Sequence, residues 1–274
     1  MTEATRKAAV LGSPVAHSLS PVIHNAGYLA AGLSGWAYER HEVAEDELAA
    51  FVDGLDESWA GLSLTMPLKE VALDVAAEVS PTARAIGAAN TLVLRDGARF
   101  AENTDAPGMV DALLDAGIEK ANTVAILGAG GTARAAVAAA VALGADDIVA
   151  YARRPESLAD LTAVAEDLGA HRFTGGTWTQ APACSAADLV ISTVPRGVAD
   201  DLAVSWGSDT TLFDVLYDPW PTPLAAGAIE AGCIVVDGLA LLLAQAVLQF
   251  ELFTGATAPV DAMREALRAA AAAR

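Results

Sequence analysis

Two charged side chains in the amino-terminal part of the chain could hold and move a proton. Lys69 closes the almost wholly apolar segment GLSLTMPLK (residues 61–69), and Asp105 lies in the polar segment AENTDAPG (residues 101–108). A buried lysine is costly unless it is paired, and a carboxylate at the end of a strand is a suitable partner. The alternative is structural: Lys69 extends its charge to solvent, and Asp105 caps a helix that begins at Pro107.

Hydroxyl and amide groups add hydrogen-bonding capacity in the same part of the chain. Ser18 and Ser20 lie in GSPVAHSLSPVIHN, between an expected strand end and a helix that opens on Pro21. There they could donate hydrogen bonds to a carboxylate without adding charge. The alternative is simple capping of that helix by Ser20. Thr65 and Asn90 interrupt two further apolar stretches, TMPLK and GAANTLV.

The segment GAGGTA (residues 128–133) has the spacing of a dinucleotide-binding loop. It lies between the apolar strand TVAIL and an alanine-rich helix, which is the context that such a loop requires. Gly128 allows the tight turn, Gly130 lets the backbone approach a pyrophosphate, and Ala133 permits close packing of helix on strand. The helix amino terminus offers N–H groups and a partial positive charge to phosphate. An ordinary tight turn is the alternative.

The end of the following strand favours NADP over NAD. An NAD site carries an acidic residue there that holds the ribose hydroxyls, whereas an NADP site uses arginine for the 2′-phosphate. The strand IVAY is followed by Ala152, Arg153 and Arg154, and no carboxylate occupies the position. Guanidinium groups bind phosphate through paired, charge-assisted hydrogen bonds, although two solvated arginines are the alternative. A nicotinamide site therefore accompanies hydroxyl groups, an amide and the pair of Lys69 and Asp105. This combination indicates that the protein oxidises a polyol acid.

The composition restricts the classes of partner. The 274 residues are 54% hydrophobic, and 35 acidic residues against 16 basic ones give a formal net charge of -19, which argues against nucleic acid. The apolar runs end before the roughly 18 residues of a membrane span, so we expect a soluble, cytoplasmic protein without membrane contact. Cys184 and Cys233 lack His or Cys neighbours at metal-ligand spacing, so we expect no metal site.

Strand-like and helical segments alternate along the chain, which indicates an α/β protein of two domains. Before Asp105, strands are expected in KAAVLGS, WAYERHEV and WAGLSLTMP, helices in PVIHNAGYLAAGL and DELAAFVDGL, and a hairpin in ANTLVLRDGARFAEN. After it, the order strand, glycine turn, helix, strand predicts a parallel, doubly wound sheet. We expect an α/β substrate domain with a mostly parallel sheet (residues 1–105 plus helices 241–274) and a Rossmann-type NADP-binding domain (residues 106–240).

The motifs of this chain resemble those of the shikimate dehydrogenase family, whose members reduce 3-dehydroshikimate to shikimate in aromatic amino-acid and chorismate biosynthesis. The resemblance runs from about Lys7 to Gly255 and is carried, in order, by GSPVAHSLSPVIHN, TMPLK, GAANTLV, NTDAPG, GAGGTARA, STVP, YDPWPTPL and DGLALLLAQ. The serine, lysine and NTD motifs are specific to this family and its quinate-using relatives, whereas the glycine loop is not.

The resemblance implies a role for individual residues. Lys69 and Asp105 would form the catalytic pair, with Lys69 acting as proton donor or chiefly as electrostatic stabiliser. The implied substrate-binding residues are Ser18, Ser20, Ser63, Thr65, Asn90, Tyr217 and Gln245. The implied NADP-binding residues are Gly128, Gly130, Gly131, Thr132, Ala133, Arg153, Arg154, Thr193, Val194, Gly238 and Leu241.

Departures from the family pattern keep alternatives open. Ser63 stands where most relatives carry asparagine, Arg154 where threonine is usual, and Leu241 where many have methionine. A dehydrogenase for quinate or for an aminated shikimate, using NAD or NADP, is one alternative. A non-catalytic NADP-binding regulator of the same fold is another. The expected partner is a small-molecule substrate, and a homodimer stays open as the assembly.

Overall fold

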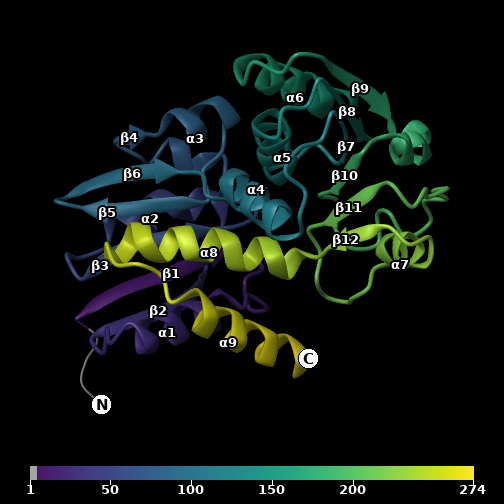
Figure 1. The fold of residues 1–274 in the computed structure, drawn as a ribbon. Helices are drawn as coiled ribbons and strands as arrows, with labels where there is room; N and C mark the ends of the chain where they lie inside the picture. Colours follow the sequence, from purple (N-terminus) through teal and green to yellow (C-terminus); the bar gives the residue numbers. More distant parts are fainter. Residues whose placement is uncertain (1–4) are drawn as a thin grey trace. The chain divides into compact units, whose positions relative to one another are not determined.

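The computed structural model describes residues 5–274, which fold into two compact units (Figure 1). Unit 1 is formed by the chain up to Thr104 together with Leu242–Arg274, and unit 2 is Asp105–Leu241. Each unit contains a six-stranded sheet. The expected fold class, an α/β substrate domain with a mostly parallel sheet and a Rossmann-type domain, is confirmed.

The sheet of unit 1 has the order β2-β1-β3-β5-β6-β4. Three of its pairings, β1 with β2, β1 with β3 and β4 with β6, are parallel, and the other two are antiparallel. Its strands are β1 (Arg6–Gly12), β2 (Trp36–Glu42), β3 (Trp59–Leu64), β4 (Glu78–Val79), β5 (Thr91–Arg95) and β6 (Ala98–Glu102). Because β5 runs against β3 and β6, its first residue lies at the edge where β1, β3 and β6 end.

The expected hairpin is formed by β5 and β6. Its turn residues, Asp96 and Gly97, both have positive φ, 53° and 74°. Two such residues build the two-residue turn whose twist matches that of the flanking strands. The turn therefore fixes the register that pairs Thr91, at the start of β5, with Glu102, at the end of β6.

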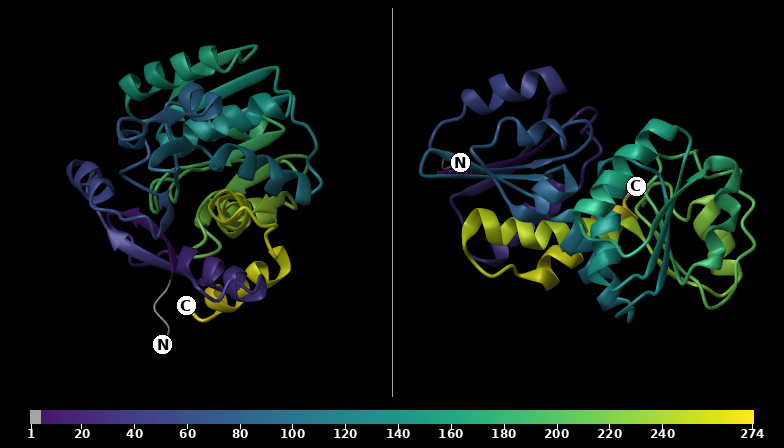
Figure 2. Two further views of the ribbon diagram at one scale, coloured as in Figure 1. Left: turned by 90° about the vertical axis from the view of Figure 1, so that its left-hand side faces the viewer. Right: turned by 90° about the horizontal axis from the view of Figure 1, so that it is seen from above.

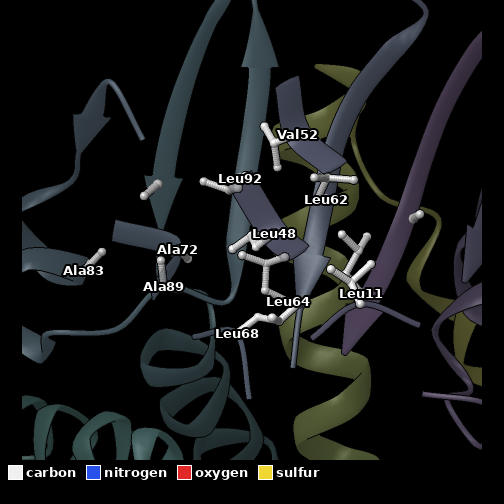
Figure 3. Close-up of a cluster of buried hydrophobic side chains, with 13 residues drawn as sticks. Leu11, Leu48, Val52, Leu62, Leu64, Leu68, Ala72, Ala83, Ala89 and Leu92 are labelled. Carbon is white, nitrogen blue, oxygen red and sulfur yellow. The ribbon is translucent and has the colours of Figure 1, made fainter. Parts of the chain in front are cut away.

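One face of the unit 1 sheet is covered by α2. Leu62 and Leu64 of β3 and Leu92 of β5 pack against Leu48 and Val52, and all five side chains are at most 3% exposed (Figure 3). The alternation of β3 therefore turns Leu62 and Leu64 toward α2 and places Gly61 and Ser63 on the opposite face.

The opposite face of the sheet carries α8. A Cβ atom added at Gly61 of β3 would come within 2.1 Å of the Phe253 ring of α8 and 2.9 Å of the Leu92 carbonyl oxygen. Glycine is therefore needed at this position for the helix to lie directly on the strand. Helix α9 packs beside α1, as Figures 1 and 2 show. The helices of unit 1 are α1 (Ser20–Ala30), α2 (Leu48–Asp53), α3 (Pro81–Ile86), α8 (Gly238–Thr254, which begins in unit 2) and α9 (Val260–Ala272).

The sheet of unit 2 is wholly parallel, with the order β12-β11-β10-β7-β8-β9. The chain starts in the middle, winds outward through β8 and β9, and then returns to build the other half, which is the strand order of dinucleotide-binding folds. Its strands are β7 (Thr123–Leu127), β8 (Asp147–Ala152), β9 (Phe173–Thr177), β10 (Leu189–Ser192), β11 (Thr211–Asp214) and β12 (Ile234–Val236).

Helices cover both faces of the unit 2 sheet. Figures 1 and 2 show α5 and α6 on one side and α7 on the other, where the 3-10 helix η3 completes the buried cluster. This arrangement buries the central strands β7, β10 and β11 almost throughout, which explains their continuous apolar sequences, whereas the edge strand β9 is largely exposed. The helices are α4 (Asp105–Asp115), α5 (Gly131–Ala142), α6 (Pro155–Asp167), η3 (Trp178–Ala186) and α7 (Pro223–Glu230).

Several elements differ from the sequence expectations. The carboxylate residue Asp105 was expected at the end of a hairpin strand or as a cap before Pro107, but it is itself the first residue of α4. The sequence patterns gave no indication of β4, α3, α6 or β9. Within residues 5–274, no helix combines the length and apolar character needed to cross a membrane. The same part of the chain contains no group of three acidic, histidine or cysteine side chains arranged to hold a metal ion.

Candidate active site

Four strand ends of unit 1 bring the predicted substrate residues to one edge of the sheet. Strands β1 and β3 end side by side, with Leu11 opposite Leu64. Asn90 immediately precedes β5, and Thr104 follows shortly after β6. We call this set of strand ends, with the loops that leave them, the substrate edge. In open α/β sheets, ligands bind beyond the carboxyl ends of parallel strands, so the substrate edge is where a ligand is expected.

Thr65 is fixed at the substrate edge by a close approach of two backbones. Its N–H donates to the Leu11 carbonyl oxygen over 2.9 Å, and its own carbonyl accepts from the Leu68 N–H. A Cβ atom at Gly12 would lie 2.4 Å from the Thr65 methyl carbon. Glycine at the end of β1 therefore leaves the space in which Thr65 sits, which gives Gly12 a function that the sequence did not reveal.

Lys69 lies in the loop that follows β3 and is partly exposed. Its carbonyl oxygen accepts a hydrogen bond of 2.7 Å from the Ala89 N–H, which ties the loop to the residue before Asn90. Leu68, its neighbour, is fully buried in the core under α2. The backbone of Lys69 is thus anchored on both sides, while its side chain keeps access to solvent.

Asn90 is almost completely buried, at 2% exposure, and the orientation of its amide is determined by its partners. Its Oδ1 atom accepts hydrogen bonds from the Thr104 backbone N–H over 2.8 Å and from the Thr91 hydroxyl over 2.9 Å. Since a backbone N–H can only donate, the atom facing it must be the oxygen. Its Nδ2 atom donates to the Thr104 hydroxyl over 2.9 Å. The amide therefore turns its oxygen inward.

Ser18 and Ser20 lie together at the amino terminus of α1. The Ser18 hydroxyl donates to the Ser20 hydroxyl and accepts from the Ser20 N–H, each over 3.3 Å. The alternative that Ser20 caps the helix is not what the structure has, because Ser20 is the first helical residue and the preceding Leu19 makes no side-chain cap. The first turn of α1 contains no acidic residue. Two hydroxyls beside a helix amino terminus suit an anion.

Ser63 belongs to an interior hydrogen-bond network. Its hydroxyl accepts from the Tyr38 hydroxyl over 2.5 Å and donates to Gln249 Oε1 over 2.6 Å. Ser63 is 4% exposed, and it lies directly opposite Thr91 in the pairing of β3 with β5. One acceptor position of the serine oxygen remains, so a contact with a ligand donor is not prevented.

Two further predicted residues lie on helices. Gln245 of α8 is 8% exposed, and its Nε2 atom donates to the Leu242 carbonyl oxygen over 2.7 Å. Asp105 begins α4 of unit 2 and is 5% exposed. It follows Thr104, whose backbone N–H is held by Asn90, so the segment leading into α4 is fixed to the substrate edge.

The glycine loop of unit 2 connects β7 to α5 as expected. Gly128 has φ of 116°, and a Cβ atom there would come within 2.5 Å of the Thr193 hydroxyl. A Cβ atom at Gly130, in contrast, would meet nothing within 4 Å. Helix α5 starts at Gly131 without a side-chain cap and without an acidic residue in its first turn, and the small Ala133 is fully buried behind it. This loop fits the pyrophosphate of a dinucleotide.

Arg153 and Arg154 follow β8 directly, and both are exposed. Within residues 5–274, neither guanidinium makes an ion pair or hydrogen bond, whereas Arg172, the residue before β9, is paired with Asp147. Two cations at the end of the second strand fit a 2′-phosphate in charge and place, and their contact with that group stays a prediction.

The other predicted cofactor residues lie near the ends of β10 and β12. Thr193 donates both its N–H and its hydroxyl to the Leu127 carbonyl oxygen, and Val194 beside it is buried. A Cβ atom at Gly238 would lie 2.0 Å from the Val215 carbonyl oxygen, so α8 must begin with glycine. Leu241, one turn later, is 8% exposed.

Asp214 holds the loop that carries Tyr217. The sequence patterns did not single out this aspartate. The carboxylate accepts from the Thr222 hydroxyl over 2.7 Å and from the Leu216 N–H over 3.3 Å. Burial raises the pKa of Asp214, and the hydrogen bonds oppose that shift. Thr222 also caps α7 through the Ala225 N–H. The signal in the sequence was a single carboxylate closing the apolar run TLFD.

Family models match most of the chain. Residues 10–92 match the model described as the shikimate dehydrogenase substrate binding domain, and residues 238–268 match the shikimate 5'-dehydrogenase C-terminal domain. Residues 123–216, which contain the glycine loop, match a model described as NADP oxidoreductase, coenzyme F420-dependent.

Individual relatives match over nearly their whole length. The chain is 35% identical to a shikimate dehydrogenase (NADP(+)) of Methanothermobacter thermautotrophicus, covering 98% of each protein. It is 40% identical to the crystal structure of Mycobacterium tuberculosis shikimate dehydrogenase, with a TM-score of 0.87 over 96% of this chain and 99% of that one. Shikimate 5-dehydrogenase of Thermus thermophilus, solved in complex with NADP(H) and shikimate, is 33% identical with a TM-score of 0.84 over 97% and 99%.

Proposed function

The chain belongs to the shikimate dehydrogenase family, and on that premise we propose that it catalyses the reversible, NADP-dependent reduction of 3-dehydroshikimate to shikimate. The observation that carries the proposal is the substrate edge, where a lysine, a buried amide and several hydroxyls lie at adjoining strand ends. These groups match a ring that bears hydroxyls and a carboxylate. The dinucleotide loop of unit 2 supplies the second half of such a reaction.

The residues of unit 2 fit NADP. Gly128, Gly130, Gly131, Thr132 and Ala133 would hold the pyrophosphate, and Arg153 with Arg154 would hold the 2′-phosphate. Thr193, Val194, Gly238 and Leu241 would line the nicotinamide half. When bound, NADP supplies or accepts the hydride. The open space beside Gly130 and the arginines without ion pairs support this assignment.

We propose that Ser18 and Ser20 hold the substrate carboxylate, because their hydroxyls stand at a helix amino terminus that has no acidic residue in its first turn. Tyr217 would reach the same carboxylate. An overall charge of -19 gives no long-range attraction for an anion, so local donors must provide the binding. Neutral donors bind the carboxylate without requiring a further buried cation.

The ring hydroxyls are assigned to Thr65, Asn90, Gln245 and Ser63. Thr65 and Gln245 can donate or accept, whereas Asn90 has turned its oxygen inward and can offer only its nitrogen. A site built from such fixed polar groups rejects a ligand that lacks the matching hydroxyl, because a buried donor would then be left without a partner.

Lys69 and Asp105 are our proposed catalytic pair. In the reducing direction, Lys69 donates a proton to the oxygen that develops negative charge, and Asp105 orients both the ammonium and the substrate hydroxyl. The same ammonium stabilises the developing charge electrostatically even before the proton has moved. The anchored backbone of Lys69 supports this role, since a proton donor must be held in place.

The decisive assay follows NADPH oxidation by the purified protein with 3-dehydroshikimate. Turnover is expected, and its absence at high enzyme concentration would refute the proposal. Shikimate and quinate, each with NADP and with NAD, are then compared in the oxidising direction. A higher kcat/KM for quinate, or for NAD, would establish the alternative dehydrogenase. Tight NADP binding without turnover of any of these acids would instead identify a regulator.

We also propose a cytoplasmic location and a homodimeric assembly. Cys184 and Cys233 are free cysteines, in keeping with a reducing compartment, and the proposed cofactor is an intracellular metabolite. Cell fractionation tests the location. Light scattering of the purified protein tests the assembly, and a monomer mass at assay concentrations would contradict it.

A further inference from the structure

A line of hydrogen bonds runs through the interior of unit 1 from β2 to Asn90, and we call it the interior relay. The Tyr38 hydroxyl donates to Ser63, and the Ser63 hydroxyl donates to Gln249 Oε1, over 2.5 Å and 2.6 Å. Gln249 Nε2 donates to the Thr91 hydroxyl over 2.9 Å, and Thr91 donates to Asn90 Oδ1 over 2.9 Å. All five side chains are at most 4% exposed.

Gln249 joins the two halves of this relay. It lies on α8, and its amide reaches a directly opposed residue pair of two antiparallel strands, Ser63 of β3 and Thr91 of β5. The glutamine also donates to the Asn90 carbonyl oxygen over 3.2 Å. Because a carbonyl oxygen can only accept, the Gln249 nitrogen must face Asn90 and Thr91, which leaves the Gln249 oxygen to accept from Ser63.

The relay and the Thr104 backbone N–H together hold the Asn90 amide in one orientation. Its Oδ1 atom accepts from the Thr91 hydroxyl as well as from the Thr104 backbone N–H. Rotation of the amide by 180° would place N–H hydrogens against the Thr104 N–H, with two donors facing each other inside the protein. In a dry interior the Thr104 N–H would lose its acceptor, and the Thr91 hydroxyl of the relay would lose the oxygen to which it donates, so both groups oppose the rotation.

We infer that Gln249 is a positioning residue for substrate recognition, acting through Thr91 to hold the Asn90 amide with its nitrogen toward the substrate edge. The inference deepens the proposed function and rests on it, because it assumes that Asn90 meets a ring hydroxyl. Ser63 links Tyr38 to Gln249 through the hydrogen bond that it donates, and one acceptor position of its oxygen remains for the substrate. The helix on the far face of the sheet thereby contributes to recognition without touching the substrate.

The test compares Gln249→Met, Asn90→Ala and the double variant in shikimate oxidation by NADP. Methionine keeps the length of the side chain and removes both hydrogen-bonding groups. We expect Gln249→Met to raise KM for shikimate about five- to tenfold, with a smaller change in kcat and an unchanged KM for NADP. In the Asn90→Ala background the same substitution should add nothing, because the group that it positions is already absent.

Thr254→Ala is the matched control. Thr254 lies on the same helix, and its hydroxyl donates to the Phe250 carbonyl and accepts from the Ala256 N–H. This variant removes two hydrogen bonds of α8 that do not lead to Asn90, so it should lower Tm without changing KM. Thr91→Val removes the hydroxyl that connects Gln249 to Asn90 and keeps the shape of the side chain. This variant replaces Gln249→Met in the test if Gln249→Met does not fold.

The outcomes separate the inference from the function on which it rests. If the wild-type enzyme does not oxidise shikimate, the proposed function fails. If the wild type turns over but Gln249→Met or Thr91→Val raises KM equally in the presence and absence of Asn90, the inference fails alone. An unchanged KM in a folded Gln249→Met enzyme would overturn it as well.

Discussion

The imidazole of His24 stacks on the phenol of Tyr38, with ring centroids 4.1 Å apart and planes within 4° of parallel. His24 is completely buried, and its other ring neighbours are Tyr28 and Phe253. Desolvation lowers the pKa of His24 to about 3, and an interaction with the Gln249 amide opposes the shift only in part. The protein therefore folds around a neutral imidazole directly behind the interior relay.

This buried histidine predicts a loss of stability in acid. Below the unfolded pKa of 6.5 the unfolded chain binds a proton that the folded state excludes, so the free energy of unfolding falls as the pH falls from 6.5 toward 3. Between pH 7.5 and pH 5 the loss from this residue is about 2 kcal/mol. Urea unfolding at both pH values measures it.

His24→Phe keeps a stacked ring and removes the titrating group. Its unfolding free energy should change with pH by about 2 kcal/mol less than that of the wild type over the same interval. The exposed His171 provides a control, because His171→Gln should follow the wild type. Equal pH dependence in His24→Phe and in the wild type would show that His24 does not govern acid stability.

Gly128 and Gly130 are predicted to respond differently to the same substitution. Gly130→Ala adds a methyl group to open space at φ of -96°, so Tm should stay within about 2 °C while KM for NADP rises at least tenfold. Gly128→Ala places a methyl 2.5 Å from the Thr193 hydroxyl at φ of 116°, so it should lower Tm markedly. Thermal melts without cofactor, followed by kinetics, distinguish the two. A folded Gly130→Ala enzyme with normal KM for NADP would remove the pyrophosphate assignment.

Arg153 is predicted to select the cofactor. Arg153→Ala should raise KM for NADP far more than KM for NAD, because only NADP carries the 2′-phosphate. If Arg154 also contacts the 2′-phosphate, Arg154→Ala should raise KM for NADP as well, but by less than Arg153→Ala. Steady-state kinetics with both cofactors at saturating shikimate provide the comparison, and Arg172→Ala is an exposed arginine control. Equal changes for NADP and NAD would refute the phosphate contact.

Local patterns were sufficient to predict much of this fold. The strands β1, β3 and β7, the helices α1 and α8, and the glycine loop all come from continuous segments whose periodicity or flanking residues identify them. The short strand β4 and the edge strand β9, with sequence FTGGT, were missed because two residues or a glycine pair carry almost no strand signal. Gly176 of β9 lies where a Cβ atom would come within 2.7 Å of the Tyr151 ring, a tertiary reason that no local pattern reveals.

In the site, too, local sequence patterns identified some residues, whereas residues whose partners are distant in the chain were missed. Lys69, Asn90 and the two serines at the start of α1, Ser18 and Ser20, stand out because each is a polar residue in an apolar setting. Gln249 did not, because its partners Ser63 and Thr91 are 186 and 158 residues away in the chain. In the sequence it is one more polar residue in an apolar helix. The substrate and cofactor roles of the site residues stay predictions until they are measured.

Lys69 carries the most direct prediction about the reaction. Lys69→Ala removes the proposed proton donor and its charge, so kcat should fall by about 10²- to 10⁴-fold, the usual contribution of a positioned acid or base, while KM for shikimate changes little. The control is Lys120→Ala, which removes a lysine of unit 2 that is exposed to solvent and should leave both constants unchanged. Stopped-flow measurement of a single turnover shows whether the loss lies in the chemical step rather than in product release. If Lys69→Ala turns over shikimate at nearly the wild-type rate, Lys69 is neither proton donor nor electrostatic stabiliser, and its position after β3 would then be that of a surface lysine.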